Sequence, residues 1–199
     1  SGKVFASAKK PRKKDEGPAE PDKDWKQEGL RSLFEGRAMA IVRVNRADEM
    51  QDAMDLFKQF ELPLQLSSAN AAAELAEKLK DEGVGVVLSA GISREDGRDY
   101  ARAAVLHQAG VRTSFKSDSA GGARFLPRVL AMAVSNGLGS EQALAGVTWQ
   151  AAEMLGIDHR VGRLVAGLDA DVVVLDGPPF DVASKVLSVW VNGEEVNKQ

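Results

Sequence analysis

The apolar positions between residues 37 and 155 follow two alternating spacings. Continuous β-rich apolar runs, typical of buried parallel strands, occupy segments 38–44, 63–66, 84–88 and 111–116. Apolar residues three and four positions apart predict helices over 47–60, 70–80, 96–109, 123–136 and 140–155. Four strand–helix units in series indicate an α/β fold with a parallel sheet covered by helices.

The pattern changes at both ends of this region. Residues 1–30 carry eight basic side chains, six acidic side chains and three prolines, which predicts a flexible charged tail or loop over 1–36. After residue 160, short β-rich runs alternate with turn residues, and Asn192-Gly193 is a strong hairpin signal. We therefore expect the α/β part to cover 37–160 and a small β-module to cover 161–199.

The amino-acid composition argues against several classes of protein. The 199 residues have a net charge of −3, which argues against a nucleic-acid-binding surface. The absence of cysteine excludes disulfides and thiolate metal sites, and only two histidines, His107 and His159, are present. No apolar run approaches the roughly 18–20 residues of a membrane span, so we expect a soluble protein, cytoplasmic or exported. The chain starts Ser1-Gly2 rather than with methionine, which indicates a processed product or a piece of a longer protein.

Two architectures fit four strand–helix units. One is a free-standing, doubly wound open sheet, and the other is part of a (β/α)8 barrel. A complete barrel needs eight such units and typically about 250 residues, so four units cannot close one.

Four stretches in order resemble a known family. Residues 148–156 match the pattern T-x-x-x-A-x-x-L-G, and residues 162–174 match G-x-(I/L)-x-x-G-x-x-A-D-(L/I)-V-V. Residues 189–196 match a closing V-x-V-x-G-x-x-V hairpin, and 117–119 match (T/S)-D-(S/T) after an apolar strand. In these stretches the chain resembles the C-terminal half of amidohydrolase-superfamily proteins, in the imidazolonepropionase-like branch.

This resemblance implies strands 5 to 8 of a TIM-like barrel, followed by a small β-sandwich module. Strands 1 to 4, with the family's His-x-His ligand pair, would lie outside this chain. The implied function is hydrolysis of carbon–nitrogen bonds other than peptide bonds, with a divalent metal, zinc above all, in the complete family. The implied partners are the missing half of the barrel, or a second copy of the chain, and a small-molecule substrate. Nucleic acid and membrane are not expected as partners.

The resemblance also assigns candidate site residues. Asp118 takes the strand-8 position of the family's catalytic, metal-binding aspartate, although a turn or helix cap would use the same residue type. Arg43 stands where the family places a histidine at the end of strand 5, and Asn70 matches a histidine after strand 6. Lys116 and Ser119 flank Asp118, so we assign Arg43, Asn70, Lys116 and Ser119 to substrate binding.

These departures from the family weaken the expected metal centre. An arginine is permanently protonated, so Arg43 cannot ligate a cation and would instead favour a carboxylate or phosphate, or pair with an acid. We therefore expect the isolated chain to be inactive, with a metal site that residues from the other half would complete. The alternative is a catalytically degenerate binding or scaffold protein of the same fold. A His-x-His motif in sequence upstream of Ser1 would favour the hydrolase.

Overall fold

The computed structural model describes residues 24–89, 98–117, 119 and 122–196, and the chain divides into two units, Ser1–Arg31 and Ser32–Gln199. The described part of the first unit contains helix α1 (Trp25–Glu28), and α2 (Arg31–Phe34) begins at its last residue. The Arg31 guanidinium donates to the Glu28 carboxylate at 2.7 Å from Nε. This pair is exposed and contributes little to stability.

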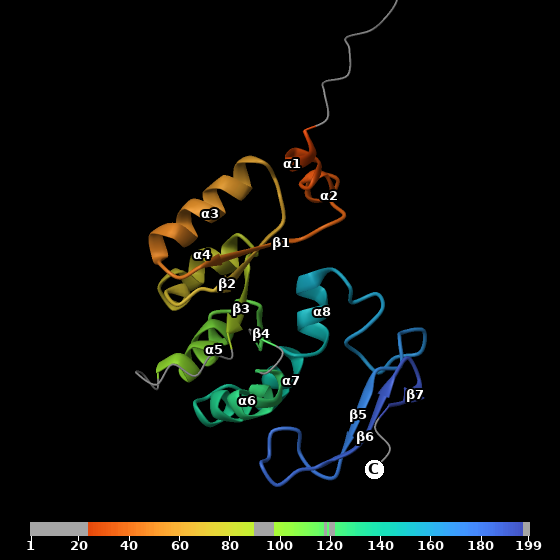
Figure 1. The fold of residues 1–199 in the computed structure, drawn as a ribbon. Coiled ribbons are helices and arrows are strands. Elements are labelled where there is room, and N and C mark those ends of the chain that lie inside the picture. The colour runs from red at the N-terminus through yellow and green to blue at the C-terminus, as the bar shows by residue number, and fades with distance from the viewer. Residues whose placement is uncertain (1–23, 90–97, 118, 120–121, 197–199) are drawn as a thin grey trace, which may run out of the picture. The chain divides into compact units, whose positions relative to one another are not determined.

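The second unit is built on a four-stranded parallel sheet (Figure 1). Its strands are β1 (Ala40–Val44), β2 (Leu64–Ser68), β3 (Gly85–Ser89) and β4 (Thr113–Lys116), in the spatial order β1-β2-β3-β4. Helices lie between successive strands: α3 (Ala47–Gln59), the short 3-10 helix η1 (Ala72–Leu75) with α4 (Ala76–Asp81), and α5 (Arg98–Gln108). Parallel neighbours require such crossovers. The predicted α/β fold is confirmed.

One face of the sheet forms the hydrophobic core with the helices. Side chains alternate between the two faces of a strand, so Val42, Leu66 and Val86, which are register partners, share one face. Leu66 and Val86 are fully buried there, and Val42 packs against the same cluster. The helices supply the rest of this core through Met50, Met54, Leu79 and Leu106.

The opposite face, called the inner face here, is more polar. Arg43, Ser67, Val87 and Ser114 form one row of register partners across it, and Ser67 and Ser114 are buried. At its amino end, a Cβ built on Gly85 would lie 2.7 Å from the Met154 methyl carbon. The amino end of the inner face is therefore closely packed and holds the buried Gln65, the register partner of Gly85, whereas Arg43, Ser67 and Ser114 lie nearer its carboxyl end.

In the described residues after β4, the helical segments are η2 (Ala123–Phe125), α6 (Leu126–Ser135), α7 (Ser140–Ala145) and α8 (Trp149–Leu155). The expectation of one helix over 140–155 is wrong. The Thr148 hydroxyl donates to the Leu144 carbonyl at 2.7 Å, and Thr148 leaves the helical region with φ −128 and ψ −110. The Gly146 carbonyl accepts from the Phe115 N–H of β4, so this break is held against the sheet. No helix within the described ranges is both long and apolar enough to cross a bilayer.

A three-stranded antiparallel sheet ends the described chain. Its strands are β5 (Val172–Leu175), β6 (Val186–Val191) and β7 (Glu194–Glu195), in the order β5-β6-β7. Asn192 and Gly193 have φ 51 and φ 80, the left-handed pair that a tight type I′ hairpin needs. The predicted β-module is therefore present, while the predicted domain boundaries at 36 and 160 stay predictions.

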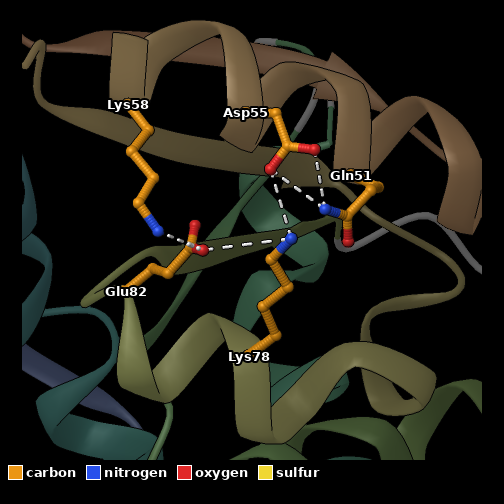
Figure 2. Close-up of polar contacts among 5 residues, drawn as sticks. All are labelled: Gln51, Asp55, Lys58, Lys78 and Glu82. Atoms are coloured by element: carbon orange, nitrogen blue, oxygen red, sulfur yellow. Dashed lines mark hydrogen bonds and ion pairs between the residues drawn. The ribbon is translucent and has the colours of Figure 1, made fainter.

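A chain of polar contacts joins the exposed sides of α3 and α4 (Figure 2). The Gln51 amide and the Lys78 ammonium both donate to Asp55, at 3.0 and 3.3 Å. The Glu82 carboxylate accepts from Lys58 at 3.2 Å and lies 3.9 Å from Lys78. The hydrogen bond from Gln51, and then that from Lys78, lowers the pKa of Asp55.

This lowered pKa predicts a pH-dependent contribution to stability. A carboxylate with a depressed folded-state pKa stabilises the fold above its unfolded pKa of about 3.9, and the contribution fades as the pH falls through the folded value. We expect Asp55→Asn to lower the urea midpoint slightly at pH 7 and to match the parent chain near pH 2. Asp52→Asn, on the same helix, is the control. A loss for Asp55→Asn that is equal at both pH values would contradict the assignment.

Candidate functional site at the carboxyl ends of the strands

The four parallel strands end at one edge of the sheet, and polar residues gather there. Arg43 is the penultimate residue of β1, and Ser68, Ser89 and Lys116 are the last residues of β2, β3 and β4. Catalytic and binding groups of (β/α)8 barrels lie at this carboxyl edge, while the amino edge serves stability. We therefore take this edge as the candidate functional site.

The end of β2 has an unusual backbone. Ser68 and Ala69 have φ 71 and φ 44, a left-handed conformation that costs energy for residues other than glycine. The Ala69 N–H donates to the Val44 carbonyl at 2.7 Å, which holds this turn against the end of β1. The turn brings the Ser68 hydroxyl to 3.2 Å from that of Ser89 on β3. A strained segment at a functional edge is a common feature of binding sites.

Arg43 lies on the inner face beside Ser67, its register partner on β2. Within residues 24–89, 98–117, 119 and 122–196, the Arg43 side chain has no hydrogen-bond or ion-pair partner, so the described residues give no acid that would neutralise it. The strand position expected from the resemblance thus carries an exposed cation that no described acid neutralises.

Asn70 lies two residues beyond the end of β2, and Ser68 is the residue at the strand end itself. The Asn70 side-chain oxygen accepts from the Arg102 guanidinium of α5 at 3.2 Å. Asn70 also borders an open pocket of about 620 Å³, whose lining comes from the two connections after β1 and β2: Asn45, Arg46, Ala47, Asp48, Asn70, Ala71 and Glu74.

Arg46 and Asp48 in this pocket compensate each other's charge, and Glu74 adds a second carboxylate to the lining. The Arg46 guanidinium donates to both Asp48 carboxylate oxygens, at 2.9 and 2.6 Å. These hydrogen bonds, and then one from the Glu49 backbone N–H, lower the pKa of Asp48 to about 2. Asp48 is therefore ionised at neutral pH and offsets the charge of Arg46, in contrast to Arg43.

The predicted residues around strand β4 are only partly brought together. Lys116 is the register partner of Ser89, but β4 and β1 are separated by two strands, so Lys116 and Arg43 start about 14 Å apart across the sheet. The Ser119 hydroxyl accepts from the Gly122 backbone N–H at 3.0 Å, as in a turn cap. Asp118 lies outside the described residues, and its predicted role stays a prediction.

Ser89 is a site residue that the sequence reasoning missed. It directly follows the buried run 84–88, and a polar residue at that position reaches the carboxyl edge. The positional signal was therefore present in the sequence. Its hydrogen bond to Ser68 was not foreseeable, because it depends on the left-handed turn at 68–69.

The described residues do not fit a divalent metal. No three histidine, aspartate, glutamate or cysteine side chains come together in the part of the chain that the structure describes. The carboxyl edge offers hydroxyls and cationic groups, which are poor ligands for zinc beside a guanidinium. Any metal bound here needs ligands from outside the described residues.

The comparisons with known proteins agree with this geometry. A model of the amidohydrolase family matches residues 64–196. The chain is 44% identical over 57 residues to Amidohydrolase tasK of Hapsidospora irregularis, covering 29% of this chain and 6% of that protein. It is 40% identical over 82 residues to the imidazolonepropionase of Rubrobacter xylanophilus, covering 39% of this chain and 20% of that protein.

A solved structure shares the fold over a larger span. The amidohydrolase from Thermotoga maritima MSB8 superimposes with a TM-score of 0.83 and 27% identity, over 92% of this chain and 50% of that one. The chain therefore spans half or less of the relatives it matches. The predicted family is confirmed, and the 82-residue match agrees with the imidazolonepropionase-like branch. The chain belongs to the amidohydrolase family.

Proposed function

We propose that this chain is the second half of an amidohydrolase barrel that hydrolyses a carbon–nitrogen bond of a small molecule. The observation that carries the proposal is the match to the amidohydrolase family over 64–196, which includes three of the four parallel strands and the β-module. The polar carboxyl edge supports it, because this is the end where barrels of this kind bind their substrates.

In this proposal the catalytic metal depends on residues that the described part does not supply. Asp118 is the one family ligand that the sequence suggests, and zinc normally takes three protein ligands and a water molecule. The other ligands would come from the strands that precede β1 in a complete barrel. When bound, such a metal would lower the pKa of a water molecule to generate the nucleophile.

A degenerate member of the fold that binds a ligand without hydrolysing it is the second candidate. One observation favours it: Arg43 occupies a strand end of the expected metal site and has no acidic partner in the described residues. A permanently charged guanidinium at that position repels a divalent metal ion and attracts an anion.

The experiment that separates the two candidates uses the protein purified from its native source, with whatever chains accompany it. Intact mass, metal content and hydrolysis of an amide and of a cyclic ureide are measured on the same preparation. Bound zinc, iron or manganese together with hydrolysis would support the hydrolase. A complete barrel without metal and without hydrolysis would support the degenerate binding protein and contradict the first candidate.

The two edge strands predict association. β1 and β4 each have one neighbouring strand in the described sheet. On the outer side of β4, the Phe115 N–H already donates a hydrogen bond to the Gly146 carbonyl at 3.1 Å. Edge strands with open backbone groups recruit further strands. We expect light scattering to give a mass above the 21.3 kDa of one chain, from self-association or a bound first half of the barrel.

A spin label locates this association. The chain has no cysteine, so one introduced cysteine is unique. A nitroxide on Ile41→Cys in β1 is expected to lose mobility on association, whereas one on Leu56→Cys, on the exposed side of α3, stays mobile. A monomeric mass with mobile labels at both positions would contradict the prediction.

A further inference from the structure

The backbone of β1 has open hydrogen-bonding groups on one side. The Ala40 N–H donates to the Pro63 carbonyl at 3.3 Å, and the Ala69 N–H donates to the Val44 carbonyl at 2.7 Å. Alternate residues of a parallel strand bond the same neighbour, so the even-numbered residues of β1 face β2. The odd-numbered residues therefore turn their N–H and carbonyl groups to the other side, where the described residues contain no strand.

The open residues are Ile41 and Arg43, and their spacing allows the strand to pair with a copy of itself. Antiparallel pairing about a two-fold axis at Val42 places Ile41 opposite Arg43 of the second copy, and Arg43 opposite its Ile41. At such positions of an antiparallel ladder, the two facing residues exchange both of their N–H···O bonds. All the outward backbone groups of Ile41 and Arg43 are then used.

The side chains favour the same register. Ile41 and Arg43 lie on the inner face, and both are exposed, Ile41 by 46%. With the axis at Val42, the apolar stem of each arginine covers the isoleucine of the other copy while its guanidinium stays in water. An axis at Arg43 would instead place two arginines directly opposite each other, and facing like charges destabilise a strand pair.

The other edge of the sheet, β4, is less open. The Val86 N–H donates to the Arg112 carbonyl at 2.9 Å, so the same alternation turns Thr113 and Phe115 outward. The Phe115 N–H is bonded to the Gly146 carbonyl at 3.1 Å, and a Cβ built on Gly146 would lie 3.2 Å from the Thr113 carbonyl oxygen. The backbone at Gly146 therefore covers part of this edge, which leaves β1 as the more open edge of the described sheet.

We propose that the chain forms a two-fold dimer in which β1 pairs antiparallel with β1 of a second copy, with the axis at Val42. The strand that precedes β1 in a complete barrel needs the same backbone groups, so the dimer and the completed barrel exclude each other. That exclusion rests on the proposed function, whereas the dimer itself does not.

A cross-linking experiment on the 199-residue chain tests the register. The chain has no cysteine, so one introduced cysteine is unique. Val42 faces itself across the axis, with Cα atoms about 4.5 Å apart, which a disulfide spans. Val44 lies about 14 Å from its copy. Mild oxidation is expected to link Val42→Cys into a covalent dimer and to leave Val44→Cys unlinked, although both valines pack against the same core.

A pair of charge variants tests the same register without a cysteine. Ile41→Glu places a carboxylate opposite Arg43 of the second copy, so we expect the dimer to tighten about threefold or more. Ile41→Lys places a like charge there and is expected to weaken the dimer by a similar factor. Val105→Glu and Val105→Lys, at a residue of α5 that is 44% exposed, are the matched controls and should leave the dimer unchanged. Sedimentation equilibrium measures the dissociation constants.

Three results would overturn the proposal. They are a parent chain that stays monomeric, cross-linking of Val44→Cys that equals or exceeds that of Val42→Cys, and association that responds equally to both charges at Ile41. The last result would place the contact elsewhere, at β4 or on the β-module. None of these measurements involves a metal or hydrolysis, so their failure would leave the proposed function standing.

Discussion

Leu66→Ala is expected to lower the free energy of unfolding by about 2–5 kcal/mol. Leu66 is fully buried in the centre of β2, between its register partners Val42 and Val86. It belongs to the same core cluster as Met54 of α3 and Leu79 of α4, so truncation leaves a cavity between the sheet and the helices. A close-packed core relaxes only partly around such a cavity, and both the lost burial and the cavity add to the loss.

The matched control is Leu56→Ala. Leu56 lies in α3 with an exposed fraction of 51%, so the same change there should cost no more than about 0.5 kcal/mol. Urea unfolding followed by circular dichroism measures both. Equal losses for the two variants would show that β2 and α3 do not form the packed interface described above.

Gly162→Ala is expected to cost about 2–5 kcal/mol, because it combines backbone strain with a steric clash. Gly162 has φ +98, and a Cβ built there would lie 2.8 Å from the Trp149 Cα and 2.9 Å from the Ala152 Cβ of α8. The Trp149 contact is to backbone, which cannot turn aside as a flexible side chain would. The substitution should push the segment that leads to the β-module away from α8.

Gly167→Ala separates the two causes. Gly167 has nearly the same backbone angle, φ +97, but no atom lies within 4 Å of a Cβ built there. We expect it to cost about 1–2 kcal/mol, the left-handed penalty alone. The difference between the two thermal unfolding curves then measures the clash, and indistinguishable curves would contradict the packing of Gly162 on α8.

The strand–helix order was predictable because each element carries its own local pattern. The runs at 38–44 and 84–88 are rich in β-branched apolar residues, and β1 and β3 are found there. The expected burial holds for most of β3, whereas Ile41 and Arg43 of β1 are exposed. The hairpin at Asn192 and Gly193 was equally local, since few other residue pairs adopt two successive left-handed conformations.

The site was less predictable because it depends on contacts between elements. No glycine marks the left-handed turn at Ser68 and Ala69, so nothing local indicates that β2 continues to Ser68 before turning. The break between α7 and α8 depends on the bond from the Phe115 N–H to the Gly146 carbonyl, more than thirty positions apart in sequence. That Arg43 has no partner among the described residues depends on where the described acids lie, which no sequence motif encodes.

The metal content of the purified 199-residue chain tests the central claim most directly, namely that this half of the barrel cannot hold the family's metal alone. The chain is incubated with zinc, iron and manganese salts, desalted, and measured by elemental analysis. The predicted result is far below one metal per chain, since Asp118 is one ligand and Arg43 repels a cation. One zinc, iron or manganese per chain, lost in Asp118→Ala, would contradict the claim.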